Sequence, residues 1–152
     1  MTRAERTTAP VTRTQIVRFA GAAGDFNPMH HDDDFAREAG QPGVFAMGQL
    51  QAAMLASMVA DWLGREDVLG YGVRFRDKVW PGDRLVLSGD VVEERDGVRR
   101  CDLQAVREAD GAVVLTGWAT ARARTTATPP SRSRRGERAP SARRGEPLRR
   151  SR

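Results

Sequence analysis

The densest group of side chains capable of chemistry lies in the segment Asp25-Phe26-Asn27-Pro28-Met29-His30. A carboxylate and an imidazole can hold one water molecule between them and take a proton from it, because histidine exchanges protons near neutrality. Pro28 has no backbone N–H and disfavours helical backbone at Asn27, so we predict a stiff loop here. Asn27 adds an amide that can orient a ligand by hydrogen bonding.

The same residues also allow interpretations without catalysis. Asp25 can be only a turn former, Asn27-Pro28 only a loop corner, and His30 a buried histidine whose ring is satisfied. The run from His30 to Asp34 is rich in metal-ligand types. Adjacent histidines rarely converge on one ion, and the chain has only 2 histidines, so we expect no metal site.

A second candidate element is Met47-Gly48, where a loop enters a long apolar segment. The first N–H groups of a helix have no partner inside the helix and attract developing negative charge. Gly48 would let a ligand approach that backbone closely, although a plain glycine at a helix start is the alternative. Ser57 and Asp61 further along the segment can face either the site or a subunit interface.

Helices that could position these groups are predicted from capping signals and periodicity. Residues 12–23 are predicted to be helical, with Thr12 and Gln15 at capping-box spacing. Three aspartates at 32–34 favour the start of a short helix that ends near Gly40. Residues 48–63 are apolar on nearly every side, so we expect a long, largely buried helix wrapped by another element.

The wrapping element is predicted to be an antiparallel sheet. Alternation and turn signals predict an edge strand at 6–11 and four further strands at 68–79, 84–94, 98–108 and 112–122. Cys101 and Trp80 are expected to pack. Curling this sheet around helix 48–63 gives an α+β fold in a single domain over residues 1–122. Its free edges and one uncovered face predict a dimer.

The net charge of the chain needs to be divided along its length. With 152 residues there is room for one domain, and the net charge of +5 suggests nucleic-acid binding. Residues 123–152, however, hold 10 arginines against 2 acids, or 10 − 2 = +8, and residues 1–122 hold 15 basic against 18 acidic residues, or −3. We predict a disordered basic tail over 123–152, either simply solvated or in electrostatic contact with nucleic acid or an acidic partner.

Three features bound the class of protein. No apolar run approaches the roughly 18 residues of a membrane span, so no membrane partner is expected. Residues 1–10 lack the apolar core of a secretory signal. The single cysteine excludes an intramolecular disulfide and a cysteine-built zinc site. A cytoplasmic location fits these features.

The segment AAGDFNPMHHD at residues 22–32, together with Met47-Gly48 and residues 80–83 (WPGD), resembles the hydratase motif of the MaoC-like, R-specific enoyl-CoA hydratase family. The resemblance covers residues 6–122 and implies a hot-dog fold, in which a sheet wraps a long helix. It also implies reversible addition of water to a trans-2-enoyl-CoA, giving an (R)-3-hydroxyacyl-CoA without a cofactor. By similarity, Asp25 and His30 with Asn27 form the catalytic group, and the Gly48 N–H binds the thioester oxygen.

One departure from the family keeps other functions open. The family's long helix commonly begins His-Gly-Met, whereas this chain has Met47-Gly48-Gln49. Loss of the histidine leaves room for a weakly active or non-catalytic subunit of a heteromeric hydratase. The expected assembly is a homodimer or a heterodimer with another hot-dog subunit. An acyl-CoA thioesterase on the same fold would place its carboxylate on the long helix, where Asp61 is the only acid.

The proposed substrate is anionic, so the domain needs locally placed cations. The overall charge of −3 on residues 1–122 does not supply them. Arg74, Arg76 and Lys78 are the candidates for CoA binding in this chain, and a partner subunit is the other source.

Overall fold

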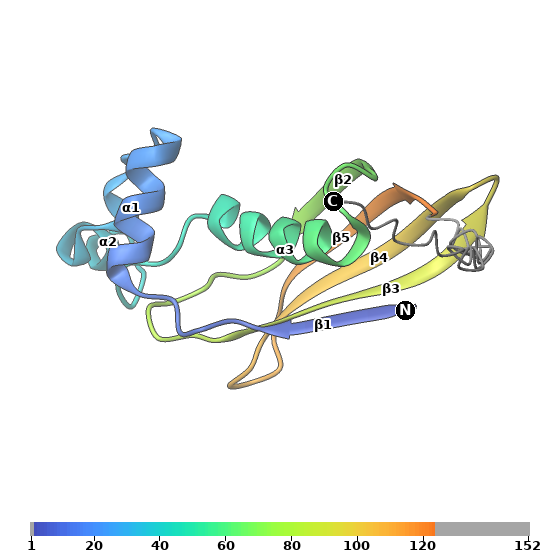
Figure 1. The fold of residues 1–152 in the computed structure, drawn as a ribbon. Helices are drawn as coiled ribbons and strands as arrows, with labels where there is room; N and C mark the ends of the chain where they lie inside the picture. The colour runs from blue at the N-terminus through green and yellow to red at the C-terminus, as the bar shows by residue number, and fades with distance from the viewer. Residues whose placement is uncertain (1, 124–152) are drawn as a thin grey trace, which may run out of the picture.

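A computed structural model describes residues 2–123. Along the chain the elements are β1 (Arg3–Thr7), α1 (Arg13–Ala23), the 3-10 turn η1 (Pro28–His30), α2 (Asp33–Glu38), α3 (Gly48–Leu63), β2 (Val68–Phe75), β3 (Leu85–Arg95), β4 (Val98–Arg107) and β5 (Val113–Arg122). Figure 1 shows α3 lying along one face of the sheet, with α1 and α2 beside each other beyond the start of α3. The predicted basic tail lies outside the described residues, apart from Ala123, whose N–H donates to the Gly97 carbonyl.

The sheet has five antiparallel strands in the order β1-β3-β4-β5-β2. Tight turns join β3 to β4 and β4 to β5, and the first of these places Asp96 and Gly97 at φ 52° and 74°. Positive φ at both central residues is the turn that matches the twist of a hairpin. The predicted α+β fold is confirmed, and these three strands lie within one residue of the predicted bounds.

The first strand was predicted at the wrong place. The sequence favoured residues 6–11, whereas β1 covers Arg3–Thr7 and pairs with residues 86–90 of β3. Within β1 only Ala4 is partly buried, so the strand has no apolar alternation to reveal it. Pro10 cannot donate to a ladder, and the chain leaves the sheet before it.

The second strand ends earlier than predicted. The alternation suggested strand to residue 79, but β2 stops at Phe75. The N–H groups of Arg76 and Asp77 both approach the Val114 carbonyl, at 2.9 and 3.4 Å, which breaks the one-to-one ladder. The segment that follows β2 therefore turns toward the start of α3.

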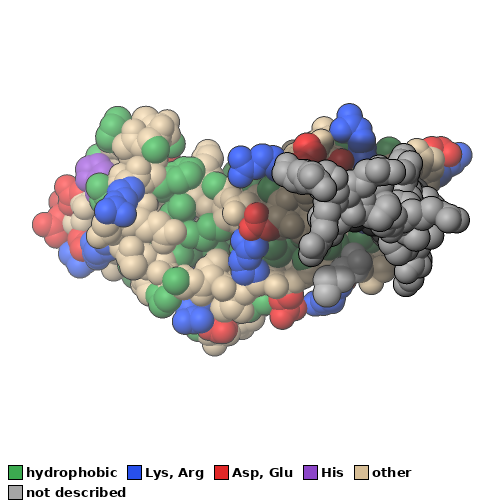
Figure 2. All heavy atoms as spheres, in the orientation of Figure 1, with side chains coloured by type: hydrophobic (Ala, Val, Ile, Leu, Met, Phe, Trp, Pro, Cys, Tyr) green, Lys and Arg blue, Asp and Glu red, His purple; other side chains and the backbone are tan. Residues whose placement is uncertain are grey.

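The core lies between α3 and the inner face of the sheet. Leu55, Met58 and Val59 of α3 are buried against sheet residues that include Leu87 and Leu115. The expectation of a largely buried helix holds for this face only, because Ala53, Ser57 and Asp61 are exposed. A single sheet covers one side of a helix. In Figure 2 hydrophobic side chains reach the surface over the region where α3 begins.

Tyr71 ties the helix to the sheet. Its hydroxyl donates to the Ala52 carbonyl at 2.8 Å, and burial raises the pKa of the phenol to about 12. An unfolded phenol titrates near 10, so above that pH the unfolded chain loses a proton that the folded protein keeps. The contribution of this group to stability is therefore complete below pH 10 and is lost as the pH rises toward 12.

We expect Tyr71→Phe to remove this part of the alkaline loss of stability. Urea midpoints measured on either side of pH 10 should fall less between the two pH values for the variant than for the wild type. Tyr71 is the only tyrosine in the chain, so the absorbance of tyrosinate reports its titration directly. A native phenol that ionises near pH 10 would contradict the assignment.

Candidate active site

Asp25 and His30 come together at the end of α1. The helix stops at Gly24 in a left-handed conformation (φ 70°), and the Asp25 N–H donates to the Ala20 carbonyl at 3.0 Å. The carboxylate oxygen Oδ2 of Asp25 lies 3.7 Å from Nε2 of His30. This separation exceeds a direct hydrogen bond, but one water oxygen can contact both atoms at about 2.8 Å. The structure thus places the two predicted side chains close enough to share one water molecule.

Asn27 shapes the turn between them. Its side-chain oxygen accepts the Met29 N–H at 3.0 Å, and its own N–H lies 3.4 Å from Oδ1 of Asp25. Pro28 follows as the first residue of η1, where its missing N–H costs nothing. The predicted stiff loop is therefore a capped 3-10 turn. The Asn27 oxygen is used in holding that turn.

His30 is buried and has a fixed ring orientation. Its side chain is 9% exposed, and Nδ1 lies 2.7 Å from the Phe45 carbonyl oxygen. A carbonyl can only accept, so Nδ1 carries the proton and the neutral ring leaves Nε2 free as an acceptor. That acceptor is the nitrogen that faces Asp25. The Phe45 ring also packs edge-on against the imidazole, with centroids 5.2 Å apart.

The loop that supplies this carbonyl is held at several points. Asp33 accepts the Val44 N–H at 3.1 Å and pairs with Arg13 at 2.8 Å. The Val44 N–H, and secondarily the Arg13 guanidinium, hold the pKa of Asp33 below its ordinary value against the opposing effect of burial. Further along, the Ala46 N–H donates to the Val79 carbonyl at 2.8 Å. These contacts join α1, α2 and the connection between β2 and β3 to the loop that orients the imidazole.

The N-terminus of α3 lies beside the pair. Met47 caps the helix without a side-chain hydrogen bond, and the N–H groups of Gly48 and Gln49 meet no acceptor among residues 2–123. Gln49 lines two cavities. One of about 340 Å³ also touches Asp25 and Met47, and one of about 250 Å³ also touches Gly48. Free donors therefore lie near the cavity that contains Asp25 and beside a second cavity.

The packing of the Phe75 ring also requires a glycine at position 48. A Cβ added at Gly48 would lie 2.6 Å from the Phe75 ring, which rests on the glycine. The ring itself is half exposed. The absence of a side chain at Gly48 therefore serves the packing of Phe75 as well as keeping the helix end open.

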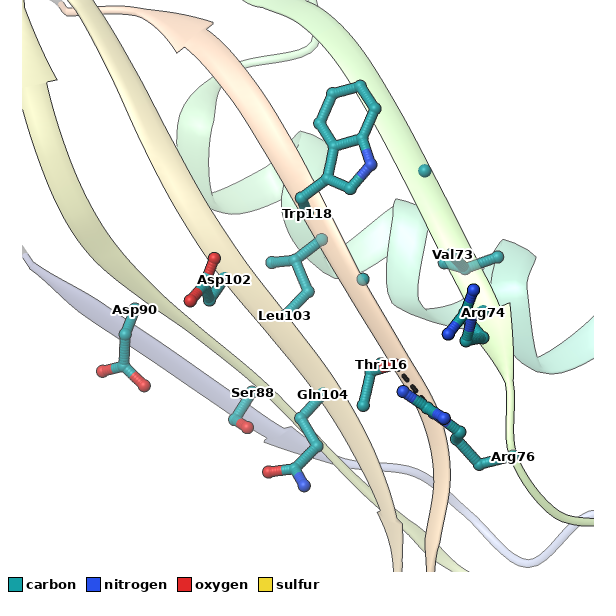
Figure 3. A pocket seen from close by; sticks show the side chains of 12 residues that line it. Val73, Arg74, Arg76, Ser88, Asp90, Asp102, Leu103, Gln104, Thr116 and Trp118 are labelled. Carbon is teal, nitrogen blue, oxygen red and sulfur yellow. Dashed lines mark hydrogen bonds between the residues drawn. The ribbon is translucent and has the colours of Figure 1, made fainter.

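The three predicted cations do not gather in one place. Arg74 and Arg76 lie on the outer face of the sheet, away from α3, where they line a groove of about 650 Å³ with Trp118 (Figure 3). Nε of Arg76 donates to the Thr116 hydroxyl at 3.2 Å. Lys78 instead lines the 250 Å³ cavity beside Gly48, with its Nζ 5.5 Å from the centroid of the Phe45 ring.

The polar residues further along α3 lie away from the pair. Asp61 near the far end of the helix binds Arg6 at 2.8 Å. Ser57 lines an apolar groove of about 340 Å³ with Arg6 and Ala53. Neither lines the cavity that contains Asp25. The only acid on α3 is therefore engaged in a surface ion pair.

Other expectations about single residues can be checked directly. Cys101 is fully buried, and burial raises the pKa of its thiol. Trp80 packs against Phe45 with ring centroids 5.7 Å apart, as a packing residue should.

Within residues 2–123 no three histidine, cysteine or acidic side chains gather as a metal site. None of the helices in this part of the chain is long and apolar enough to cross a membrane.

A five-stranded antiparallel sheet that packs against one long helix defines a hot-dog fold, as the sequence resemblance implied. The R-hydratase PhaJ1 from Pseudomonas aeruginosa superposes with a TM-score of 0.72 at 29% identity, over 80% of this chain and 79% of that one. The ChsH1-ChsH2 complex from Mycobacterium tuberculosis gives a TM-score of 0.70 at 24% identity, over 80% of this chain and 94% of that one, which shows the shared fold.

The family follows from the sequence comparison. The model of the MaoC like domain matches residues 1–112, and the chain belongs to this family of hydratases and dehydratases. Enoyl-CoA hydratase ChsH3 of Mycobacterium tuberculosis is 35% identical over 97 residues, which is 62% of this chain and 32% of that protein. The chain thus spans about a third of the length of that relative.

Proposed function

We propose that this chain adds water reversibly to the 2,3-double bond of a trans-2-enoyl-CoA and forms an (R)-3-hydroxyacyl-CoA. The observation that carries the proposal is the 3.7 Å approach of Asp25 Oδ2 to His30 Nε2, beside the open N-terminus of α3. Membership of a family of hydratases and dehydratases supports it.

The pair would divide the two proton transfers. A water held between Asp25 and His30 attacks C3 of the substrate and loses one proton as its oxygen forms the new bond. His30 Nε2 is suited to receive that proton because Nδ1 already donates to the Phe45 carbonyl. A proton from the pair then reaches C2, so the elements of one water are added and no cofactor is consumed.

The α3 N-terminus would stabilise the charge that develops. As water attacks C3, electrons move toward the thioester oxygen, which gains enolate character. A thioester oxygen placed at the Gly48 N–H would meet a donor that has no other partner among the described residues. Removing one such donor from an active site typically costs roughly 3–4 kcal/mol of transition-state stabilisation.

Lys78 is the cation we assign to the phosphates of CoA. It lines the cavity next to Gly48, and no ion pair to a described carboxylate neutralises its ammonium group. Arg74 and Arg76 face the opposite side of the sheet. They would reach CoA only if the nucleotide passed around the β2 edge, so their contribution is the smaller one.

A second hot-dog subunit, identical or different, would complete the enzyme. The side of α3 that bears Ala53 and Ser57 is uncovered, and β2 pairs with a neighbour along one edge only. The ChsH1-ChsH2 structure is a complex of two different chains. Light scattering should give at least a dimer, whereas a monomer at high concentration would refute this.

The lone buried thiol of Cys101 fits the reducing cytoplasm.

A subunit with little activity of its own is the second candidate. Met47, 2% exposed, lines the same cavity as Asp25 and cannot donate or accept a proton there. If the family's histidine at this position is needed, the purified chain will hydrate poorly until a partner is added. An acyl-CoA thioesterase would instead release free CoA from a saturated acyl-CoA.

The decisive experiment follows the loss of the enoyl-thioester absorbance of crotonyl-CoA and longer enoyl-CoAs with purified protein. We expect turnover with at least one chain length, and chiral analysis should give the (R) product. Absence of hydration across the panel, with or without a hot-dog partner, would overturn the proposal.

A further inference from the structure

Gln51 is a buried amide with one unused atom. It lies one turn into α3, three positions after Gly48, and is 2% exposed. Its Nε2 donates to the Asp77 carbonyl at 3.4 Å, and this contact sets the orientation of the amide, since only the NH2 group can face a carbonyl. Its Oε1 is buried and meets no donor among residues 2–123. A buried acceptor without a donor is rare in proteins, so this oxygen is available to a donor that the described residues do not supply.

The surroundings of Gln51 indicate where that donor comes from. Gln51, Gly48 and Lys78 line the same cavity of about 250 Å³. Gln51 and Gly48 are three positions apart and so lie on the same side of the helix. The free N–H of Gly48 and the Gln51 amide are therefore about one helical turn apart beside this cavity.

We propose that Oε1 of Gln51 accepts a hydrogen bond from the first amide N–H of the substrate's pantetheine arm. The inference rests on the proposed function. In such a thioester, the sulfur and two methylenes separate the carbonyl from that N–H, a span of about one helical turn, roughly 5 Å. The carbonyl at the Gly48 N–H would place the amide at Gln51. CoA and acyl carrier proteins share this arm, so the contact recognises both.

The approach to Gln51 passes Phe75. Oε1 itself is covered in the free chain, while the Phe75 ring lines the same cavity and is 49% exposed. An exposed ring at the end of β2 can rotate at little cost. Entry of the arm would turn this ring aside and bring the substrate amide to the buried acceptor.

The test pairs one variant with two substrates. Gln51→Leu should lower kcat/KM about 10-fold, the effect of one lost hydrogen bond, for the crotonyl thioester of N-acetylcysteamine, which contains the amide. It should leave kcat/KM unchanged for the crotonyl thioester of an alkanethiol of equal length, which lacks the amide. Gln104→Leu, the same change on the outer face of the sheet, should affect neither. Equal losses on both substrates would show that Gln51 acts structurally or through a water, and would overturn the inference.

Binding provides a readout that does not depend on turnover. Gln51→Leu removes an unsatisfied acceptor together with one long hydrogen bond to the Asp77 carbonyl, so the thermal midpoint of the free protein should change little. S-butyryl-N-acetylcysteamine should raise the midpoint of the wild type more than the amide-free analogue does, and this difference should vanish in Gln51→Leu. A difference that persists in the variant would overturn the inference. Amide-dependent binding without any hydration would instead overturn the proposed function alone.

Discussion

Replacing His30 by alanine is expected to lower kcat for enoyl-thioester hydration by about 100- to 10,000-fold, the usual contribution of a positioned acid–base group. Asp25→Asn should have an effect of the same size, because it keeps the volume of the side chain but cannot accept the water proton. Both atoms that face the proposed water, Oδ2 of Asp25 and Nε2 of His30, are removed or neutralised in these variants. Stopped-flow or steady-state absorbance assays measure the loss of kcat.

A matched control variant exists for His30 and for Asp25. His31 is exposed and only approaches the Phe26 carbonyl, at 3.3 Å, and Asp34 is an exposed carboxylate paired with Arg37. His31→Ala and Asp34→Asn should retain turnover within a few-fold. Thermal melts must show that all four variants fold, since His30 also donates to the Phe45 carbonyl. Undiminished turnover in both Asp25→Asn and His30→Ala would rule out the water-activating pair.

Gly117→Ala is expected to lower the free energy of unfolding by about 2–3 kcal/mol through overpacking. A Cβ at Gly117 would lie 2.6 Å from the Gly72 carbonyl oxygen and 3.1 Å from Val73. The first of these is backbone in β2, which is hydrogen-bonded to β5 along its length, so relief of the clash would disturb the β2–β5 ladder. Because β2 leads to Phe75 and Lys78, the proposed site should lose activity along with the fold.

Gly21→Ala provides a control of opposite sign. Gly21 lies inside α1, and a Cβ there would meet nothing within 4 Å. Alanine favours a helix interior over glycine, so this variant should gain about 0.5–1 kcal/mol. Urea unfolding of the two variants beside the wild type measures both changes. A midpoint for Gly117→Ala at or above the wild-type value would show that the sheet accommodates the methyl group.

The bounds of α3 could be predicted from the sequence because a mostly apolar run lies between Gly48 and Gly64. The hairpin bounds followed from turn residues whose backbone preferences are local, such as Asp96-Gly97. The short edge strand β1 could not be predicted in the same way. Its side chains are nearly all exposed, and its register depends on pairing with β3, which is distant in sequence.

The candidate site could be predicted only in part, for a similar reason. The proximity of Asp25 and His30 follows from a short, stiff turn, whereas the Phe45 carbonyl is a backbone group that leaves no trace in a side-chain pattern. Arg74, Arg76 and Lys78 were named together as candidate cations, and all three fall within the strand predicted at 68–79. The early end of β2 separates Lys78 from the other two. Gln51 did have a signal, as one of two amides within a mostly apolar helix, but its unpaired oxygen appears only in three dimensions.

Apart from Lys78, all the groups assigned to water activation or substrate binding, from Asp25 to Gln51, lie in one continuous stretch between the end of α1 and the first turn of α3. The sheet contributes the wall behind that stretch and no acid or base. Because of this division, the residues from Asp25 to Gln51 can change while the sheet stays the same. A duplicated copy could lose or rewrite those residues, keep its sheet and its subunit contacts, and persist as an inert partner. Heteromeric assemblies with one working half are a natural product of this architecture.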